Sequence, residues 1–202
     1  MSPHTDKNLI KLARAIYELV LHEEDKKMLV ELDGIGLEAG CIFDDRDNTK
    51  GTLHPDLGFN VREFIIFKIE AHDATDAMYR EYTDVARETI EYLEKKYDIQ
   101  TFPTTSPHKK ENYLIKLARS LFNLVDNESD TKILASYRGL LLNAKSVFDE
   151  YFNKTGKLHL DLGGELFKYY LIKMDGDKSA AESYKELPED IIMNLEKEYS
   201  IH

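Results

Sequence analysis

The chain has 202 residues and a hydrophobic share of 42%, which is enough to bury a core in one or two domains. Its formal net charge of −11 disfavours unassisted binding to nucleic acid or to an anionic membrane, because neutralising phosphates needs clustered lysine and arginine. The acidity permits a basic protein partner or a surface that imitates nucleic acid, although solubility alone also explains it. No apolar stretch of about eighteen residues predicts a membrane span, and no signal-peptide pattern precedes the first helical pattern, so we expect a cytoplasmic protein.

The chain repeats itself after roughly a hundred residues, a period that is too long for a solenoid and matches a duplicated domain. Three segments recur with few changes, namely Leu-Ile-Lys-Leu-Ala-Arg at 9–14 and 114–119, Leu-His-x-Asp-Leu-Gly at 53–58 and 158–163, and Leu-Glu-Lys-x-Tyr at 93–97 and 195–199. We therefore predict one unit over 1–100, a linker over 101–107 and a second unit over 108–202.

The first element of each unit is predicted to be an amphipathic helix, because apolar residues fall at helical spacing over 9–20 and over 114–125. Four basic residues point away from that apolar stripe, namely Lys11, Arg14, Lys116 and Arg119. We interpret them either as partners of carboxylates on a neighbouring helix or as a small anion site, and ion pairing is the simpler interpretation.

A second helix follows a polar break in each unit, over 28–43 and over 133–148. Gly34 and Gly139 stand at equivalent positions inside it, although a glycine costs a helix about 1 kcal/mol relative to alanine. Their presence in both units predicts a close approach between helices, or a kink. Cys41 has a serine at its counterpart, so we expect a small buried residue and not a nucleophile.

A turn is predicted over 44–51 and over 149–156, because each segment ends in glycine. Asn60 followed by Glu63 is typical of a helix N-cap with its capping-box partner. The apolar runs at 61–69 and 166–174 have strand-like composition, but their neighbours are all helical. We interpret each run as a helix that is apolar nearly all round, and we expect these two helices to form the contact between the units.

The last helix of each unit is predicted to begin near Asp73 or Thr75 and near Ser179, where Glu182 completes a capping box. Pro188 predicts a kink or a new helix start within the second copy. Each unit thus has about four helices. The predicted fold is all-α, a tandem duplication of a roughly 100-residue four-helix unit with the two units packed about a pseudo-twofold axis.

The repeated histidine and aspartate pairs are the sharpest chemical signal in the sequence, and they are His54 with Asp56 and His159 with Asp161. Histidine and carboxylate at this spacing could hold a metal or another ligand, or could form a base with its orienting carboxylate. The structural alternative is stronger, because histidine in a turn before a helix often bonds a backbone carbonyl and aspartate at that point caps the helix.

Tyr82 and Tyr184 recur in both units as well. We interpret them as packing over the edges of the core, with a place on a binding surface as the alternative. The chain has no phosphate-binding glycine loop, no nucleophile elbow and no paired cysteines, so no cofactor is predicted.

The predicted function is a non-catalytic, acidic protein-interaction module such as an inhibitor, an immunity-type protein or an adaptor, whose partner is another protein. One alternative is a metal- or small-ligand-binding protein, with a hydrolase included, that uses the His-x-Asp loops. Another is an acidic nucleic-acid mimic that blocks a DNA-binding enzyme, but the lysines interleaved among the carboxylates argue against a purely acidic stripe.

Overall fold

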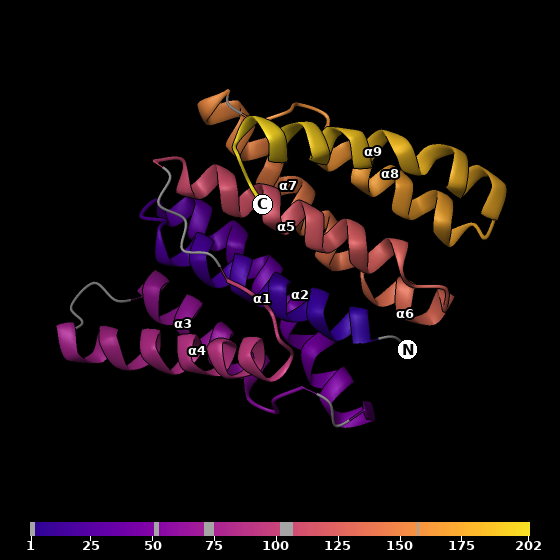
Figure 1. Ribbon diagram of the computed structural model, residues 1–202. Coiled ribbons are helices and arrows are strands. Elements are labelled where there is room, and N and C mark those ends of the chain that lie inside the picture. Colours follow the sequence, from indigo (N-terminus) through magenta and orange to yellow (C-terminus); the bar gives the residue numbers. More distant parts are fainter. Residues whose placement is uncertain (1–2, 51–52, 71–74, 102–106, 157) are drawn as a thin grey trace.

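The computed structural model describes residues 3–50, 53–70, 75–101, 107–156 and 158–202, and every regular element within these ranges is an α-helix (Figure 1). The prediction of an all-α chain is confirmed. The first half forms α1 (Pro3–Leu21), α2 (Lys26–Lys50), α3 (Leu57–Glu70) and α4 (Asp76–Lys96). The second half forms α5 (Lys109–Asp126), α6 (Thr131–Ser136), α7 (Arg138–Thr155), α8 (Leu162–Met174) and α9 (Lys178–Glu198). None of these described helices has the length and apolar character needed to cross a membrane.

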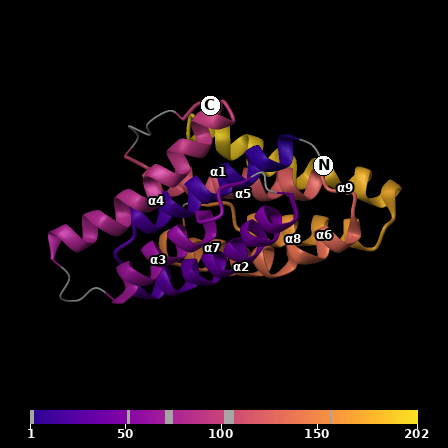
Figure 2. The same ribbon diagram turned by 90° about the horizontal axis from the view of Figure 1, so that it is seen from below.

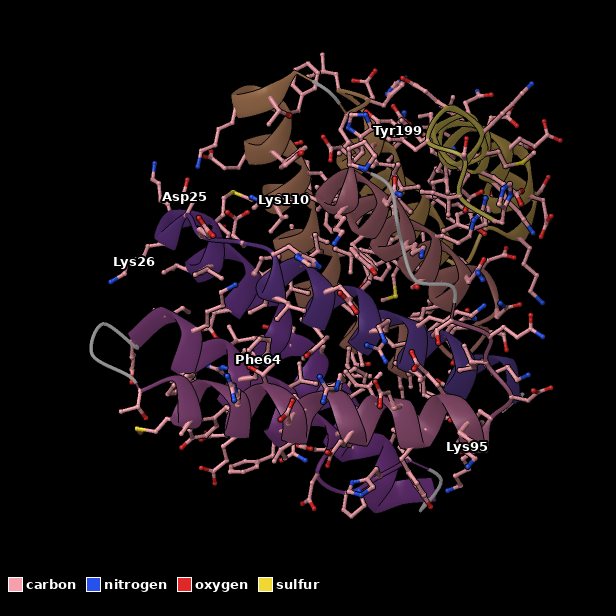
Figure 3. All side chains as sticks on the ribbon, turned by 60° about the vertical axis from the view of Figure 1, so that its left-hand side comes forward. Asp25, Lys26, Phe64, Lys95, Lys110 and Tyr199 are labelled. Atoms are coloured by element: carbon pink, nitrogen blue, oxygen red, sulfur yellow. The ribbon has the colours of Figure 1, made fainter. Side chains whose placement is uncertain are left out.

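The two halves pack through α1 against α5 and through α2 against α7 (Figures 1 and 2). The α1–α5 pair is antiparallel, since Asn123 near the end of α5 donates to Asn8 near the start of α1, at 3.4 Å. At the other end of the pair, Lys110 binds the Glu23 carboxylate at 3.1 Å. Asp25, which Figure 3 labels, binds Lys154 of α7 through its carboxylate at 2.7 Å. These polar contacts join the halves along one edge.

The expectation that the third helices join the units is wrong. Helix α3 packs on α2 and α4, and helix α8 packs on α7 and α9, so each lies within its own half. These segments are helical as predicted, despite their strand-like composition, because neighbouring helices cover their apolar sides.

Helices α1 and α5 form the centre of the molecule, and this follows from their broad apolar stripes. Helix α1 contacts α2, α3, α4 and α5, so little of it faces solvent. Leu9, Leu12 and Ile16 of α1 are fully buried, as are Ile115 and Leu117 of α5. Burying one such side chain contributes about 1.5–3 kcal/mol, so the two stripes contribute strongly to the stability of the core.

The core repeats one aromatic contact with the residue types exchanged. In the first half Tyr17 of α1 packs on Phe64 of α3 with ring centroids 5.1 Å apart, and Figure 3 labels Phe64. In the second half Phe122 of α5 packs on Tyr169 of α8 at 5.6 Å. The tyrosine therefore changes sides while the contact is kept.

Glycine allows two close approaches between helices. A Cβ atom on Gly34 would lie 3.2 Å from the Asn143 side chain across the α2–α7 crossing, and one on Gly139 would lie 2.5 Å from the Glu38 carboxyl group. Positions 38 and 143 are equivalent in the repeat, so the two contacts correspond, and the predicted close approach is confirmed.

Gly58 and Gly163, which end the repeated Leu-His-x-Asp-Leu-Gly segments, have the same role within each half. A Cβ on Gly58 would lie 3.0 Å from the backbone of Gly40 in α2, and a Cβ on Gly163 would lie 3.0 Å from the Lys145 Cα in α7. Only a residue without a side chain lets α3 and α8 approach α2 and α7 this closely.

The two predicted turns after the second helices begin later than the sequence suggests. Helix α2 continues to Lys50, and Gly51 lies outside the described residues. Helix α7 continues to Thr155, and Gly156 then ends it in the left-handed conformation, with φ of 61°. Asn60 lies inside α3 and is not an N-cap, since its side-chain amide donates to Thr89 of α4 at 2.9 Å.

The last helices of the two halves, α4 and α9, begin close to the predicted positions. Thr75 caps α4 as predicted, but Asp177, and not Ser179, caps α9, where its carboxylate accepts from the backbone of Ala180 at 3.0 Å. Pro188 lies inside α9 without starting a new helix.

The second helix of the second half is interrupted at Tyr137, between α6 and α7, while α2 runs through the equivalent position. Cys41 is exposed, so the expectation of a buried cysteine is wrong.

The last turns of α1 and α5 are held by one lysine each. Lys68 of α3 donates to the backbone carbonyls of 20–21, and Lys173 of α8 donates to those of 125–126. A cation at the carboxyl end of a helix binds the free carbonyls and opposes the helix dipole. Burial lowers the pKa of Lys68 to about 8, although the carboxylate of Glu23 raises it in part.

Candidate functional site

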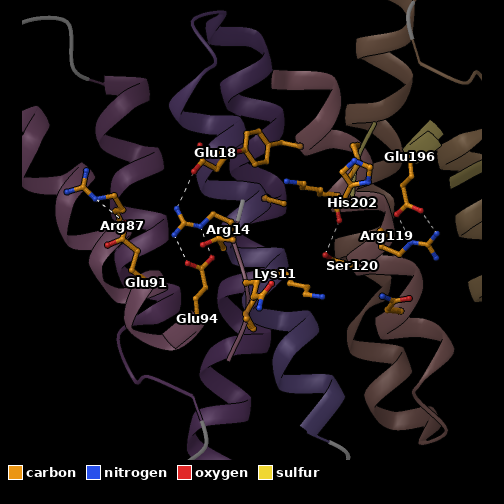
Figure 4. A pocket seen from close by; sticks show the side chains of 18 residues that line it. Lys11, Arg14, Glu18, Arg87, Glu91, Glu94, Arg119, Ser120, Glu196 and His202 are labelled. Atoms are coloured by element: carbon orange, nitrogen blue, oxygen red, sulfur yellow. Dashed lines mark hydrogen bonds and ion pairs between the residues drawn. The ribbon is translucent and has the colours of Figure 1, made fainter. Parts of the chain in front are cut away.

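A cleft of about 620 Å³ opens between α1 and α5 and is bounded by α4 and α9 (Figure 4). This volume lies within the range of roughly 300–1,000 Å³ that is usual for ligand-binding sites. Its walls come from the first and last helices of both halves and from the segments that follow α4 and α9. Most of the lining residues stand at equivalent positions of the repeat, among them Lys11 and Lys116, Arg14 and Arg119, and Glu94 and Glu196.

The chain enters the cleft after α4 and α9 through the same turn. Asp98 and Ser200 both have φ of 52°, a left-handed conformation that is uncommon for residues other than glycine. Each turn is closed by the next residue, since Ile99 donates to the Glu94 carbonyl and Ile201 to that of Glu196, both at 2.8 Å. The turns therefore direct the two isoleucines into the lining of the cleft.

Two bidentate ion pairs form opposite walls of the cleft. Arg14 of α1 donates its Nε and Nη2 to Glu94 of α4 at 2.8 and 2.7 Å. Arg119 of α5 makes the same two bonds to Glu196 of α9, also at 2.8 and 2.7 Å. Paired parallel bonds of this kind are strong and fix the geometry of both side chains. They hold α4 on α1 and α9 on α5.

The glutamate partners raise the pKa of both arginines. Burial lowers the pKa of the Arg14 guanidinium, but the bonds and charges of Glu94 and Glu18 outweigh it, and the pKa is raised overall. For Arg119, the bond to Glu196 is the largest influence and also raises the pKa. Both arginines are thus fixed cations.

The two walls differ in their carboxylates, and one of the differing positions is that of Glu18. Glu18 accepts from Arg14 at 3.2 Å and lies 3.4 Å from His22, whereas the equivalent residue Asn123 is neutral and donates to Asn8. Burial lowers the pKa of His22, and attraction to Glu18 raises it in part. Together with Glu91 of α4, this gives the first wall three carboxylates (Glu18, Glu91, Glu94), whereas the second wall has only Glu196 among the described lining residues.

Lys116 is a half-buried cation in the lining of the cleft. It lies on α5 between Tyr113 and Ser120, and its ammonium stands 5.1 Å from the centre of the Tyr113 ring. This ammonium makes no hydrogen bond or ion pair to any residue that the structure describes. Burial lowers the pKa of Lys116, Glu18 raises it and Arg14 lowers it further. Its counterpart Lys11 is exposed to solvent and also lines the cleft.

The charges of the lining nearly cancel. Five basic side chains (Lys11, Arg14, Arg87, Lys116, Arg119) face four carboxylate side chains (Glu18, Glu91, Glu94, Glu196), and His202 also lies in the lining. Because the whole chain carries a net charge of −11, the cleft differs from the average surface.

The His-x-Asp loops lie outside the lining of the cleft. His54 and His159 each accept a backbone hydrogen bond at Nδ1 from Asp56 and Asp161, both at 3.2 Å, and the two aspartates are exposed. His54 also packs edge-on against Tyr92 at 5.9 Å. Asp161 makes no side-chain bond to the start of α8. Among the described residues, no group of three or more potential ligands is arranged to hold a metal ion.

Tyr82 and Tyr184 also lie outside the cleft lining, where they join the last two helices of each half. Tyr82 stacks on Phe67 with ring centroids 4.6 Å apart. Tyr184 donates to the Glu165 carboxylate, and the ammonium of Lys168 lies 4.7 Å from the centre of its ring. Both tyrosines thus cover edges of the core.

All four basic residues singled out from the sequence line the cleft, whereas their partners Glu94 and Glu196 were not singled out as site residues. The signal for the glutamates was present in the repeated Leu-Glu-Lys-x-Tyr segment, which keeps a carboxylate at both positions. Comparison with known protein families, with characterised proteins and with solved structures gives no match for this chain.

Proposed function

We propose that the chain is a non-catalytic protein-interaction module, and that the cleft between α1 and α5 receives a segment of the partner protein. The observation that carries the proposal is the cleft itself, which has the volume of a binding site and is built from equivalent positions of both halves. Its nearly balanced charge supports docking of a protein segment, since like-charge repulsion from the acidic chain is locally relieved.

The same proposal includes the origin of the architecture, a tandem duplication of a four-helix unit packed about a pseudo-twofold axis. Three recurring features support it: the arginine–glutamate pairs, the lysines that hold the ends of α1 and α5, and the glycine contacts. A cytoplasmic location is also proposed, because the exposed, unpaired Cys41 suits a reducing compartment.

A crosslinking experiment tests the docking site. A photoreactive amino acid at Gln100, an exposed residue that lines the cleft, should capture a defined protein in cells of the native host. The matched control places the same group at Ser146, which is exposed on α7 and does not line the cleft. Identical capture patterns at the two positions would contradict the proposal.

Binding of a small ligand in place of a peptide segment is the second candidate, and the cleft volume favours it equally. Under this candidate the Gln100 crosslinker captures no protein, and a small molecule that copurifies with the chain is found by native mass spectrometry. The related hypothesis of a metal or hydrolase site at the His-x-Asp loops predicts that His54→Ala with His159→Ala abolishes function, whereas loss of stability alone indicates a structural role.

A further inference from the structure

We propose that Lys116 forms a subsite in the cleft for a single carboxylate group of the ligand. This inference rests on the proposed function of the cleft as a binding site, and it specifies the chemistry that the site recognises. The carboxylate belongs either to an Asp or Glu side chain of a partner segment or to a small organic acid.

The ammonium of Lys116 is partly withdrawn from water. The side chain is half-buried, and within the described part of the chain nothing accepts a hydrogen bond from it. A partly desolvated ammonium is unfavourable without an anion nearby, which is the reason that burial lowers the pKa of Lys116. The face of the Tyr113 ring stabilises the charge in part but leaves the donors free.

Lys116 differs from the other cations of the cleft in lacking both a bound carboxylate and full contact with solvent. Arg14 and Arg119 already hold Glu94 and Glu196, and Arg87 lies 2.7 Å from Asp84. Lys11 is exposed, so water satisfies its ammonium. Lys116 is therefore the lining cation that gains most from an incoming anion.

The surroundings of Lys116 favour an anion with a single negative charge. The charge of Glu18 raises the pKa of Lys116, but Glu18 is already bound to Arg14 at 3.2 Å and lies beside His22. The lining holds five basic side chains and four carboxylate side chains, and Arg14 and Arg119 each already bind one of these carboxylates. A single carboxylate supplies one negative charge for the one ammonium of Lys116, whereas a doubly charged phosphate would meet stronger repulsion from the four glutamates.

The experiment uses two ligands that differ only in charge, N-acetylglutamate amide and its neutral isostere N-acetylglutamine amide. Each is titrated into the full chain at constant ionic strength, and the lysine side-chain resonances are followed by NMR. We expect the charged ligand to shift the Lys116 signal to saturation and to raise the measured pKa of Lys116, because an anion favours the protonated form. Propionate, a carboxylate without peptide groups, shows whether the acid alone is sufficient.

Matched variants locate the effect. Lys116→Met should weaken binding of N-acetylglutamate amide by about tenfold or more, because a charge-assisted hydrogen bond is lost. Lys116→Arg should retain most of the affinity. Lys11→Met, at the equivalent position of the other half, should change it by less than about threefold, as expected for an exposed charge.

Three results would overturn the subsite: equal binding of the neutral isostere, equal losses in Lys11→Met and Lys116→Met, or no response of Lys116 to either carboxylate. If the Gln100 crosslinker still captures a defined protein in any of these cases, the proposed interaction function stands and only the carboxylate chemistry is wrong. If the capture fails while Lys116 binds the carboxylates, the subsite stands and the cleft serves a small ligand.

Discussion

Lys11 and Lys116 occupy the same position of the repeat and face the same cleft, yet one is solvated and the other half-buried. The difference does not come from the framework, because the arginine–glutamate pair beside each lysine has the same geometry. It accompanies single exchanges on the cleft wall, such as Glu18 in one half for Asn123 in the other. The two walls thus keep the same arginine–glutamate geometry, while the side chains beside these ion pairs differ in charge.

The largest difference between the halves is expected from breaking the two ion pairs. Arg14 and Glu94 have side-chain exposures of 16% and 6%, whereas Arg119 and Glu196 have 24% and 23%. Arg14→Met leaves a carboxylate buried without a partner and should lower the free energy of unfolding by about 2–3 kcal/mol, against about 1–2 kcal/mol for Arg119→Met. Urea unfolding measures both, and equal losses would mean that burial does not separate the pairs.

The glycine contacts should behave alike in the two halves. Gly58→Ala and Gly163→Ala force α3 and α8 away from a facing backbone, and each should lower the free energy of unfolding by about 1–3 kcal/mol. Gly164→Ala is the control, because a Cβ there meets nothing within 4 Å. That variant should gain roughly 0.5–1 kcal/mol from helix propensity. A neutral Gly163→Ala in thermal unfolding would show that the second half tolerates a wider helix spacing.

The pH dependence of stability should reveal Lys68. Its folded pKa of about 8 lies below the ordinary lysine value of 10.5, because burial disfavours the charged form. Between these values the unfolded chain binds more protons than the folded chain, so the free energy of unfolding rises with pH. Unfolding of the native chain and of Lys68→Met, compared from pH 7 to 10, should show a steeper rise in the native chain, because the lowered pKa values of Lys116 and Lys173 remain in the variant. Parallel curves would mean that Lys68 keeps its ordinary pKa.

The smallest effect is expected at the two cleft lysines themselves. Lys116→Met removes a partly desolvated charge and should raise the melting temperature slightly at pH 7, since burial penalises the ammonium in the folded chain. Lys11→Met removes a solvated charge and should leave the melting temperature nearly unchanged. Calorimetry at low salt checks the sign, and destabilisation by Lys116→Met would show that its contact with Tyr113 outweighs the desolvation.

The sequence predicted the parts of the fold that depend on periodic apolar residues. The stripes at 9–20 and 114–125 predicted the central helices, and Gly34 with Gly139 predicted a close helix crossing. The contact between halves was assigned to the wrong helices, because an all-round apolar helix such as α3 can be covered by its own half as well as by the other. Periodicity shows how much of a helix is buried but does not identify the helix that covers it.

The ends of elements and the cleft were harder to predict. Asn60 and Glu63 form a capping pattern that the structure places inside α3, because Leu57 and Gly58 already begin the helix there. The basic residues of the cleft were found from their recurrence, but their surroundings depend on the antiparallel packing of α1 on α5. Long-range packing of this kind leaves no local pattern in the sequence, so the half-buried state of Lys116 could not be foreseen.

The antiparallel crossing of α1 with α5 and of α2 with α7 has a consequence for how the chain could be divided. Each half conceals the apolar side of the other, and the contacts that unite them are made by corresponding helices. If the chain were cut between α4 and α5, the two resulting polypeptides would expose complementary apolar surfaces. They should therefore reassemble without a covalent connection. Because one chain contains both halves, every molecule has one copy of each half and a cleft whose two walls differ.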